Sequence, residues 1–216
     1  MTKTIVKHVA DFALTGAGEN PAWGRAEWLP LTKVNGMSEY SSKAKVLYSD
    51  TGIYFHVDNE DKQLTCSALN DFDNLYTEDV VEVFLWTEEA HPVYFEYEIS
   101  PLDAELPILI SNSGSRFHGW LPWHFEGARR TRHATWIRGG EKQPMAAVQG
   151  WQTEFFFPFA LFAGLENVPP APGATWRANI YRIDYDSGQA AQWAWCPDTG
   201  SNFHAYRQFG VFEFER

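Results

Sequence analysis

The chain has 216 residues, of which 44% are hydrophobic and 16% aromatic, so it can bury one large core or two small ones. Its formal net charge of -11 and its pI near 5.0 argue against nucleic acid and against anionic membrane surfaces, because both partners attract an excess of Lys and Arg. Neutral ligands and cations remain possible binding partners.

Two cysteines, Cys66 and Cys196, are too few for a disulfide scaffold and cannot form a zinc site alone, and whether they pair is open. No segment has the length of a transmembrane helix. The N-terminal residues Met1–His8 lack the apolar run of a signal peptide. We therefore expect a cytoplasmic protein or the mature form of a secreted or periplasmic one.

The first clear element is a β-hairpin. Apolar and polar residues alternate at Ala44–Tyr48 and again at Ile53–Val57, and Ser49–Gly52 between them has turn chemistry. A polar loop with five acidic residues then covers Asp58–Asn74.

Similar alternation continues to the end of the chain. Further strands are predicted at Glu78–Trp86, Val93–Ser100, Trp151–Phe157, Trp176–Asp184 and Phe209–Phe214. One short helical turn is predicted at Pro158–Phe162, whereas the Trp-, His- and Arg-rich segment 111–138 gives no clear pattern. Short strands separated by turns, without long helical periodicity or a linker, predict one all-β domain over residues 1–216, a β-sandwich or barrel.

The strand Glu78–Trp86 has two unlike faces. Alternation places Val81 and Val83 on one face, typical of a core, and Glu82 with Phe84 on the other. A carboxylate beside an aromatic ring suits a sugar, because the ring packs under the C–H groups and the carboxylate accepts hydrogen bonds from hydroxyl groups. A half-exposed strand with solvated glutamates is the alternative.

Several separated segments together resemble carbohydrate-binding module family 9 and the wider DOMON-related β-sandwiches. The segments that carry the resemblance are Leu14–Gly16, Pro21–Trp23 with Ala26, the hairpin Ala44–Val57, Leu75–Phe84, Tyr94–Pro101, Trp176–Arg182, Asn202–His204 and Phe209–Gly210. Their order spans nearly the whole chain. The resemblance implies a two-sheet antiparallel β-sandwich of jelly-roll or DOMON-like type, with little helix, that holds a sugar in a pocket.

The family's sugar site falls on identifiable positions of this sequence. Its two stacking tryptophans correspond to Tyr76 and Phe203, and its signature glutamate corresponds to Glu82. Both stacking positions are therefore aromatic without being Trp, which leaves the sugar itself open. The resemblance also implies structural calcium, for which the acidic loop Asp58–Asp73 offers oxygen ligands without a fixed-spacing motif.

Five further residues are candidates for the ligand site. Glu78 and Glu98 would share the face of Glu82, as ligand contacts or as plain surface charge. Arg182 would either form a structural ion pair or hold sugar hydroxyls with its guanidinium fork. Trp195 would border the pocket or pack in the core, and His204 adjoins Phe203.

Two other functions compete with non-catalytic sugar binding. Glu82, Glu96 and Glu98 on neighbouring strands could form the paired carboxylates of an enzyme acting on glycosides. DOMON relatives include haem-binding electron-transfer domains with Met and His ligands, for which His204 and Met37 are the candidates. Which sugar is bound, whether any catalytic activity exists and the oligomeric state are not readable from the sequence.

Overall fold

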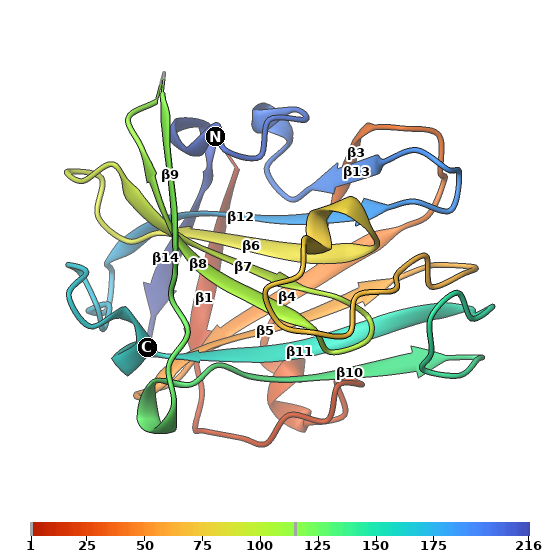
Figure 1. Cartoon of the computed structure of the whole chain (residues 1–216). Coiled ribbons are helices and arrows are strands. Elements are labelled where there is room, and N and C mark those ends of the chain that lie inside the picture. The colour runs from red at the N-terminus through yellow and green to blue at the C-terminus, as the bar shows by residue number, and fades with distance from the viewer. Residues whose placement is uncertain (1, 115) are drawn as a thin grey trace.

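Strands dominate the computed structural model, which describes residues 2–114 and 116–216 (Figure 1). The strands are β1 (Lys3–His8), β2 (Leu29–Pro30), β3 (Thr32–Asn35), β4 (Ser42–Tyr48), β5 (Gly52–Asn59), β6 (Val80–Trp86), β7 (Val93–Ile99), β8 (Glu105–Asn112), β9 (Phe117–Pro122), β10 (Arg132–Arg138), β11 (Gly150–Pro158), β12 (Thr175–Asp184), β13 (Ala191–Ala194) and β14 (Gly210–Glu215).

The helical segments are short 3-10 turns. They are η1 (Pro21–Arg25), η2 (Leu75–Thr77), η3 (Gly127–Arg129), η4 (Phe159–Phe162), η5 (Pro197–Thr199) and η6 (Tyr206–Gln208). Within the described residues, none of these helices has the length or apolar character needed to cross a membrane.

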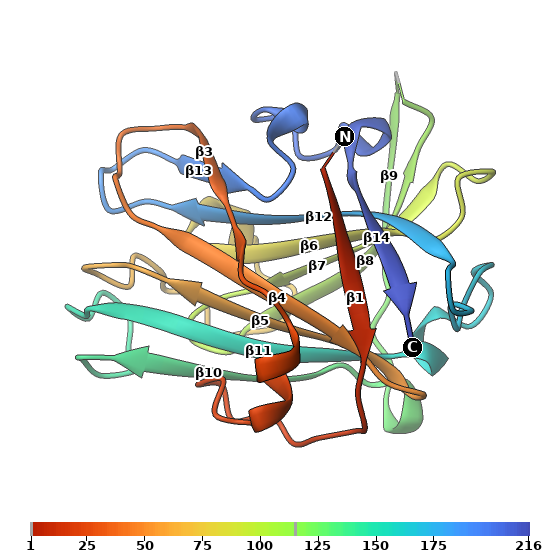
Figure 2. The ribbon, with the colours of Figure 1, turned by 180° about the vertical axis from the view of Figure 1, so that it is seen from behind.

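The strands form one continuous, curled sheet in the order β10-β11-β5-β4-β1-β14-β12-β6-β7-β8-β9. β1 pairs in parallel with both β14 and β4, and the other strand pairs are antiparallel. Figure 2 shows β1 and β14 running steeply between two arms of the sheet, one formed by β10, β11, β5 and β4 and the other by β12, β6, β7, β8 and β9. The all-β class is therefore confirmed, but the expected two antiparallel sheets are joined into a single mixed sheet, because β1 lies hydrogen-bonded between the arms.

The predicted hairpin and several predicted strands are present. β4 pairs antiparallel with β5, Tyr48 opposite Ile53, and the Ser49 N–H donates to the Gly52 carbonyl across the turn at 2.8 Å. The short helical turn is η4. By contrast, no strand was predicted at β1, β2, β3, β8, β9, β10 and β13.

Two apolar clusters lie on opposite faces of β6. Val81, Val83 and Leu85 point into the larger core together with aromatic side chains of β5 and β11. Val80, Phe84 and Trp86 point to the other face and pack in a second cluster with residues of β7, β8 and β12. The alternation predicted for this strand is thus confirmed, and its second face carries the site described below. Cys66 and Cys196 are both buried and unpaired thiols.

The two end regions of the sheet meet at Glu105, the first residue of β8. Its buried carboxylate accepts hydrogen bonds from the Thr131 hydroxyl at 2.7 Å and the Tyr97 hydroxyl at 2.9 Å. His133 Nδ1, on the terminal strand β10, lies 3.1 Å from the same carboxylate. Polar contacts therefore bring β10 close to β8, which neighbours the other terminal strand.

Candidate functional site

A cavity of about 350 Å³ opens on the second face of β6, β7, β8 and β12. Its floor carries three acidic residues among apolar ones, and its walls come from η2, β9 and the loop that follows η5. The lining residues are Asn74, Tyr76, Glu82, Glu96, Glu98, Leu106, Ile108, Ile110, Phe117, Trp120, Ile183, Gln192, Ser201, Asn202, Phe203 and His204.

Strand register brings the three floor glutamates together. Glu82 of β6 lies directly opposite Glu98 of β7 in the antiparallel pair. Glu96 is two residues along β7 and therefore points to the same face. All three side chains are buried, with relative exposures of 3%, 4% and 2% for Glu82, Glu96 and Glu98.

Burial and mutual repulsion keep this cluster largely protonated. Burial, and then the charge of Glu98, raises the pKa of Glu82 well above its usual value. Burial, and then the charges of Glu82 and Glu98, does the same to the pKa of Glu96. Burial raises the pKa of Glu98 to about 7, against the lowering effect of hydrogen bonds from the Glu96 carboxyl and the Tyr76 backbone. Near neutral pH the floor thus offers both protonated carboxyls, which donate and accept, and a titrating carboxylate, which accepts.

Part of this acidic floor has no donor from the protein. Among residues 2–114 and 116–216, no N–H or hydroxyl group donates to the buried Oε2 atoms of Glu96 and Glu98. A buried polar atom without a hydrogen-bond donor is costly, by roughly 1–3 kcal/mol. The protein itself therefore leaves hydrogen-bonding capacity unused at the floor of the cavity.

Aromatic side chains line the walls above the floor. Tyr76 projects from η2 and is 50% exposed, while Phe203 is 8% exposed and stacks on Tyr181 with a centroid distance of 3.9 Å. The Tyr181 hydroxyl also donates to the Phe203 carbonyl at 3.2 Å, which fixes that loop. From β9, Phe117 and Trp120 add two further half-exposed rings.

His204 lines the same cavity next to Phe203. Its Nδ1 atom is 2.8 Å from the Tyr94 hydroxyl and 3.9 Å from Glu96 Oε2. Burial lowers the pKa of His204, so the ring is neutral at pH 7. A neutral ring in this place can hydrogen-bond a ligand hydroxyl.

Glu78 has a different place from the one expected. Its carboxylate accepts hydrogen bonds from the Ser67 N–H at 2.6 Å and the Ala68 N–H at 2.9 Å, and it does not line the cavity. It joins the two ends of the loop that leads into η2. Glu78 therefore supports the backbone that presents Tyr76. It lies between η2, which ends at Thr77, and β6, which begins at Val80, so strand alternation does not apply to its side chain.

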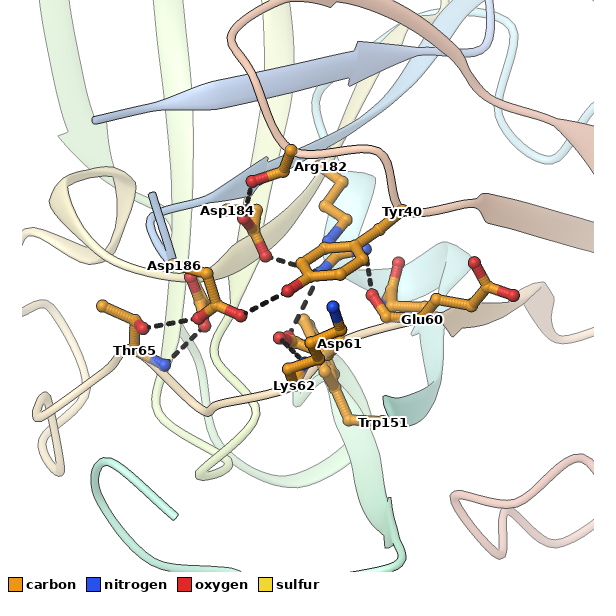
Figure 3. Close-up of polar contacts among 12 residues, drawn as sticks. Tyr40, Glu60, Asp61, Lys62, Thr65, Trp151, Arg182, Asp184 and Asp186 are labelled. Atoms are coloured by element: carbon orange, nitrogen blue, oxygen red, sulfur yellow. Dashed lines mark hydrogen bonds and ion pairs between the residues drawn. The ribbon is translucent and has the colours of Figure 1, made fainter. Parts of the chain in front are cut away.

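Arg182 also lies away from the cavity. It follows Tyr181 on β12, so its side chain points to the core face, where it is fully buried. Its guanidinium donates to Asp184 at 2.9 Å, to Asp61 at 3.1 Å and to the Glu60 carbonyl at 2.6 Å (Figure 3). Arg182 was expected either to form a structural ion pair or to hold sugar hydroxyls, and the structure shows the ion pair.

Four aspartates surround this arginine and fit the calcium that the resemblance implies. One carboxylate oxygen from each lies within 4.8 Å of the others, from Asp61, Asp79, Asp184 and Asp186. One guanidinium offsets only part of their charge, and burial raises the pKa of Asp61 to about 7 and that of Asp79 to about 8. Clustered carboxylate oxygens are the ligands that calcium prefers, so these four side chains would hold the ion, with Asp61 coming from the acidic loop.

Trp195 belongs to the core. It is 5% exposed and packs against Phe212 at a centroid distance of 5.1 Å. A Cβ at Gly210 would lie 2.6 Å from its ring, so the close approach of β14 requires that glycine. Trp195, which lies directly after β13, therefore belongs to the larger core cluster and does not line the cavity.

Other lining residues were not identified from the sequence. Asn74 precedes η2, and Gln192 lies on β13. Ser201 and Asn202 lie in the loop before Phe203. A short polar residue next to a predicted stacking aromatic was the available signal for Asn74 and Asn202, whereas Gln192 reaches the cavity only through tertiary structure.

Comparison with known families confirms the predicted resemblance. Residues 15–107 match the family described as "Carbohydrate family 9 binding domain-like". The matched segment contains Tyr76, Glu82 and Glu98, while Phe203 and His204 lie outside it. A comparison with curated proteins gave no match.

Solved structures share the fold over nearly the full chain. A Bacteroides uniformis protein proposed to bind carbohydrate superposes with a TM-score of 0.78 at 18% identity, covering 99% of each chain. A family 9 carbohydrate-binding module from Caldicellulosiruptor kristjanssonii, in complex with cellotriose, gives 0.68 at 15% identity, covering 99% of this chain and 94% of the other. A family 9 module from the same organism, in complex with glucose, superposes with a TM-score of 0.67 at 15% identity, covering 100% of this chain and 97% of the other.

Proposed function

Starting from the family 9-like match, we propose that this protein binds carbohydrate without transforming it, and holds the end of a saccharide in the cavity over Glu82, Glu96 and Glu98. We also propose that residues 1–216 act as one domain, since β1 and β14, far apart in sequence, pair in a single sheet.

One observation carries the proposal. At the floor of a cavity with aromatic walls, one buried carboxyl oxygen each of Glu96 and Glu98 has no hydrogen-bond donor in the part of the chain that the structure describes. A ligand for such a place needs several hydroxyl groups to satisfy the floor and flat C–H faces to contact the rings. Sugars combine both features, and two structural neighbours are complexes with sugars, cellotriose and glucose.

Each group would have a separate part in binding. The rings of Tyr76 and Phe203 would contact the pyranose faces. Glu98 would accept hydroxyl hydrogens as a carboxylate, while protonated Glu82 and Glu96 would both donate and accept. His204 and the amides of Asn74, Asn202 and Gln192 would complete the polar contacts at the rim.

The cavity size limits the ligand and its affinity. A volume of about 350 Å³ lies at the small end of ligand pockets, so the site would enclose the terminal residues of a chain and not a long segment. Few groups are then immobilised, and we expect a Kd in the micromolar to millimolar range, roughly 4–8 kcal/mol.

Calorimetric titration with glucose and cellotriose, followed by a glycan array, tests the proposal. The Trp120→Ala variant should weaken cellotriose more than glucose, because Trp120 stands at the β9 rim and would meet a second sugar. Trp136→Ala removes a similarly exposed ring from β10, which does not line the cavity, and should leave both isotherms unchanged. An array without any bound glycan would contradict the proposal.

The glycoside-active alternative is tested with the same ligands. A non-catalytic protein should leave cellotriose intact after prolonged incubation, as judged by chromatography. Turnover that disappears in Glu82→Gln while binding persists would instead assign the paired glutamates to hydrolysis. Incubation with haem and a spectrum of the Soret region tests the DOMON-type alternative, and among the lining residues described above no methionine accompanies His204.

A further inference from the structure

A second cluster of polar side chains lies on the other face of β8, away from the sugar cavity. Asp71, Glu105 and His124 each bring one ligand-type atom within 4.8 Å of the other two. They come from the acidic loop, the start of β8 and the segment after β9, so separate parts of the chain converge there. Nothing in the proposed sugar binding uses this cluster.

His124 has an unexplained polar atom. Its Nε2 is shielded from solvent, yet it makes no hydrogen bond with any of the residues that the structure describes. The atom lies 3.4 Å from Glu105 Oε1 without the geometry of a hydrogen bond. Two ligands at about 2.0–2.2 Å from a tetrahedral ion lie about 3.3–3.6 Å apart, so this separation is the one expected of an imidazole and a carboxylate on one metal.

The surrounding contacts hold the three side chains in place. The Glu105 N–H donates to Asp71 Oδ1 at 3.1 Å, and the Phe72 N–H donates to the Glu105 carbonyl at 3.0 Å. The Phe72 ring meets the His124 ring edge to face at 5.7 Å. The Tyr97 hydroxyl donates to the other carboxylate oxygen of Glu105, Oε2, and the Thr131 hydroxyl lies within hydrogen-bond distance of both oxygens, as outer partners of metal-bound carboxylates do.

We propose that Asp71, Glu105 and His124 bind a divalent transition-metal ion, with Zn²⁺ the best match to one imidazole and two carboxylates. Solvent completes the coordination on the side of Asp71, which is exposed. Calcium prefers oxygen ligands alone, and this distinguishes the cluster from the four aspartates around Arg182.

The ion would have a structural effect on the sugar cavity. Asp71 belongs to the loop that leads to Asn74 and Tyr76, and Glu105 begins the strand that supplies Leu106 and Ile108 to the floor. Metal binding would therefore fix the Tyr76 loop to β8 and to the segment before β10. The proposal itself does not depend on which ligand the cavity holds.

Titration of the chelator-treated, untagged full chain with Co²⁺ tests the site. We expect one equivalent to bind with visible absorption of a low-coordinate N/O site, and one equivalent of Zn²⁺ to abolish that absorption. His124→Gln should weaken Co²⁺ binding by at least about tenfold. His91→Gln is the matched control, because His91 forms an exposed pair with Glu166 at 3.7 Å and lies outside the cluster.

The melting temperature provides the second measurement. Zn²⁺ should raise it in the wild type and in His91→Gln but not in His124→Gln, while all three chelator-treated proteins melt alike. Absence of Co²⁺ absorption together with absence of a Zn²⁺-induced shift would overturn the proposal. Equal loss of binding in both histidine variants would also overturn it, since the metal would then bind to surface histidines.

Discussion

Glu82 and Glu98 face each other across the antiparallel strands β6 and β7, and both carboxyls are buried on the cavity side of the sheet. Two buried carboxylates directly opposite one another would repel, and the fold avoids this by raising the pKa values of both groups, so that they are ionised less readily than in the unfolded chain. Above pH 4.5 the pair therefore lowers the free energy of unfolding, and a bound ligand that hydrogen-bonds the two carboxyls would offset part of this loss.

Glu98→Gln should flatten the pH dependence of stability. Burial raises the pKa of Glu98 from its ordinary value of 4.5 to about 7 in the folded protein, so between these values the folded state binds more protons than the unfolded state. The free energy of unfolding must then fall as pH rises from 4.5 to about 7, by on the order of 3 kcal/mol for this group. Urea unfolding at intervals across that window measures the slope, and Glu126→Gln at an exposed position should keep the wild-type slope.

Tyr76→Ala should remove sugar binding with little effect on folding. The ring is half-exposed, so its truncation opens no core cavity, whereas the loss of one stacking wall should weaken binding at least about tenfold. Tyr76→Phe keeps the ring and should bind nearly as the wild type does. An unchanged isotherm for Tyr76→Ala, in a protein of normal melting temperature, would remove Tyr76 from the site.

Phe203→Ala should affect both properties. Phe203 is nearly buried and stacks on Tyr181, so truncation should cost about 3 kcal/mol of stability as well as the second wall. Thermal unfolding and calorimetry on the same sample separate the two effects. Phe203→Leu, which refills most of the volume, should recover stability but not the stacking contact; recovery of full affinity would argue against a stacking role.

Arg182→Met should be strongly destabilising without a direct effect on the ligand. It leaves Asp61 and Asp184 buried without their cation, a loss of about 3–5 kcal/mol. Arg130→Ala breaks an exposed pair with Glu126 and should cost about 0.5 kcal/mol or less. Similar unfolding curves for the two variants would show that the buried network contributes little.

Calcium should stabilise the protein through the four aspartates. At a hundredfold excess over Kd, the melting temperature should rise by about 5–10 °C and return to its starting value with EDTA. Asp186→Asn should reduce this shift, while Asp198→Asn, at an exposed position, should not. A shift of equal size in Asp186→Asn would place the ion elsewhere.

The sequence predicted the elements whose two faces differ chemically. β4, β5, β6, β7, β11 and β12 all show alternation because one face packs in the core. β1 was missed because Thr4 and Lys7 make its pattern weakly apolar, and its position depends on pairing with β4 and β14. β9 was missed because most of it is exposed on both faces, so its residues show no alternation between apolar and polar positions.

Prediction of the site succeeded in part for a similar reason. Glu82 and Glu98 share a face by strand alternation, and Tyr76 and Phe203 came from the resemblance; all four line the cavity, and their roles in binding stay predictions. Because β12 is buried on both faces, its alternation alone did not show whether the face of Arg182 was the core or the cavity side, and Trp195 lies directly after β13, a strand that was not predicted.

The parallel pairing of β1 with β14 makes the fold dependent on its last strand. A chain leaving the ribosome presents β1 early, but β14, which completes its hydrogen bonds, emerges about two hundred residues later. Until then one edge of β1 and the aromatic core behind it lie open to other strands, a condition that favours aggregation. We therefore expect truncation within Gly210–Glu215 to harm expression in soluble form far more than its distance from the sugar cavity would suggest.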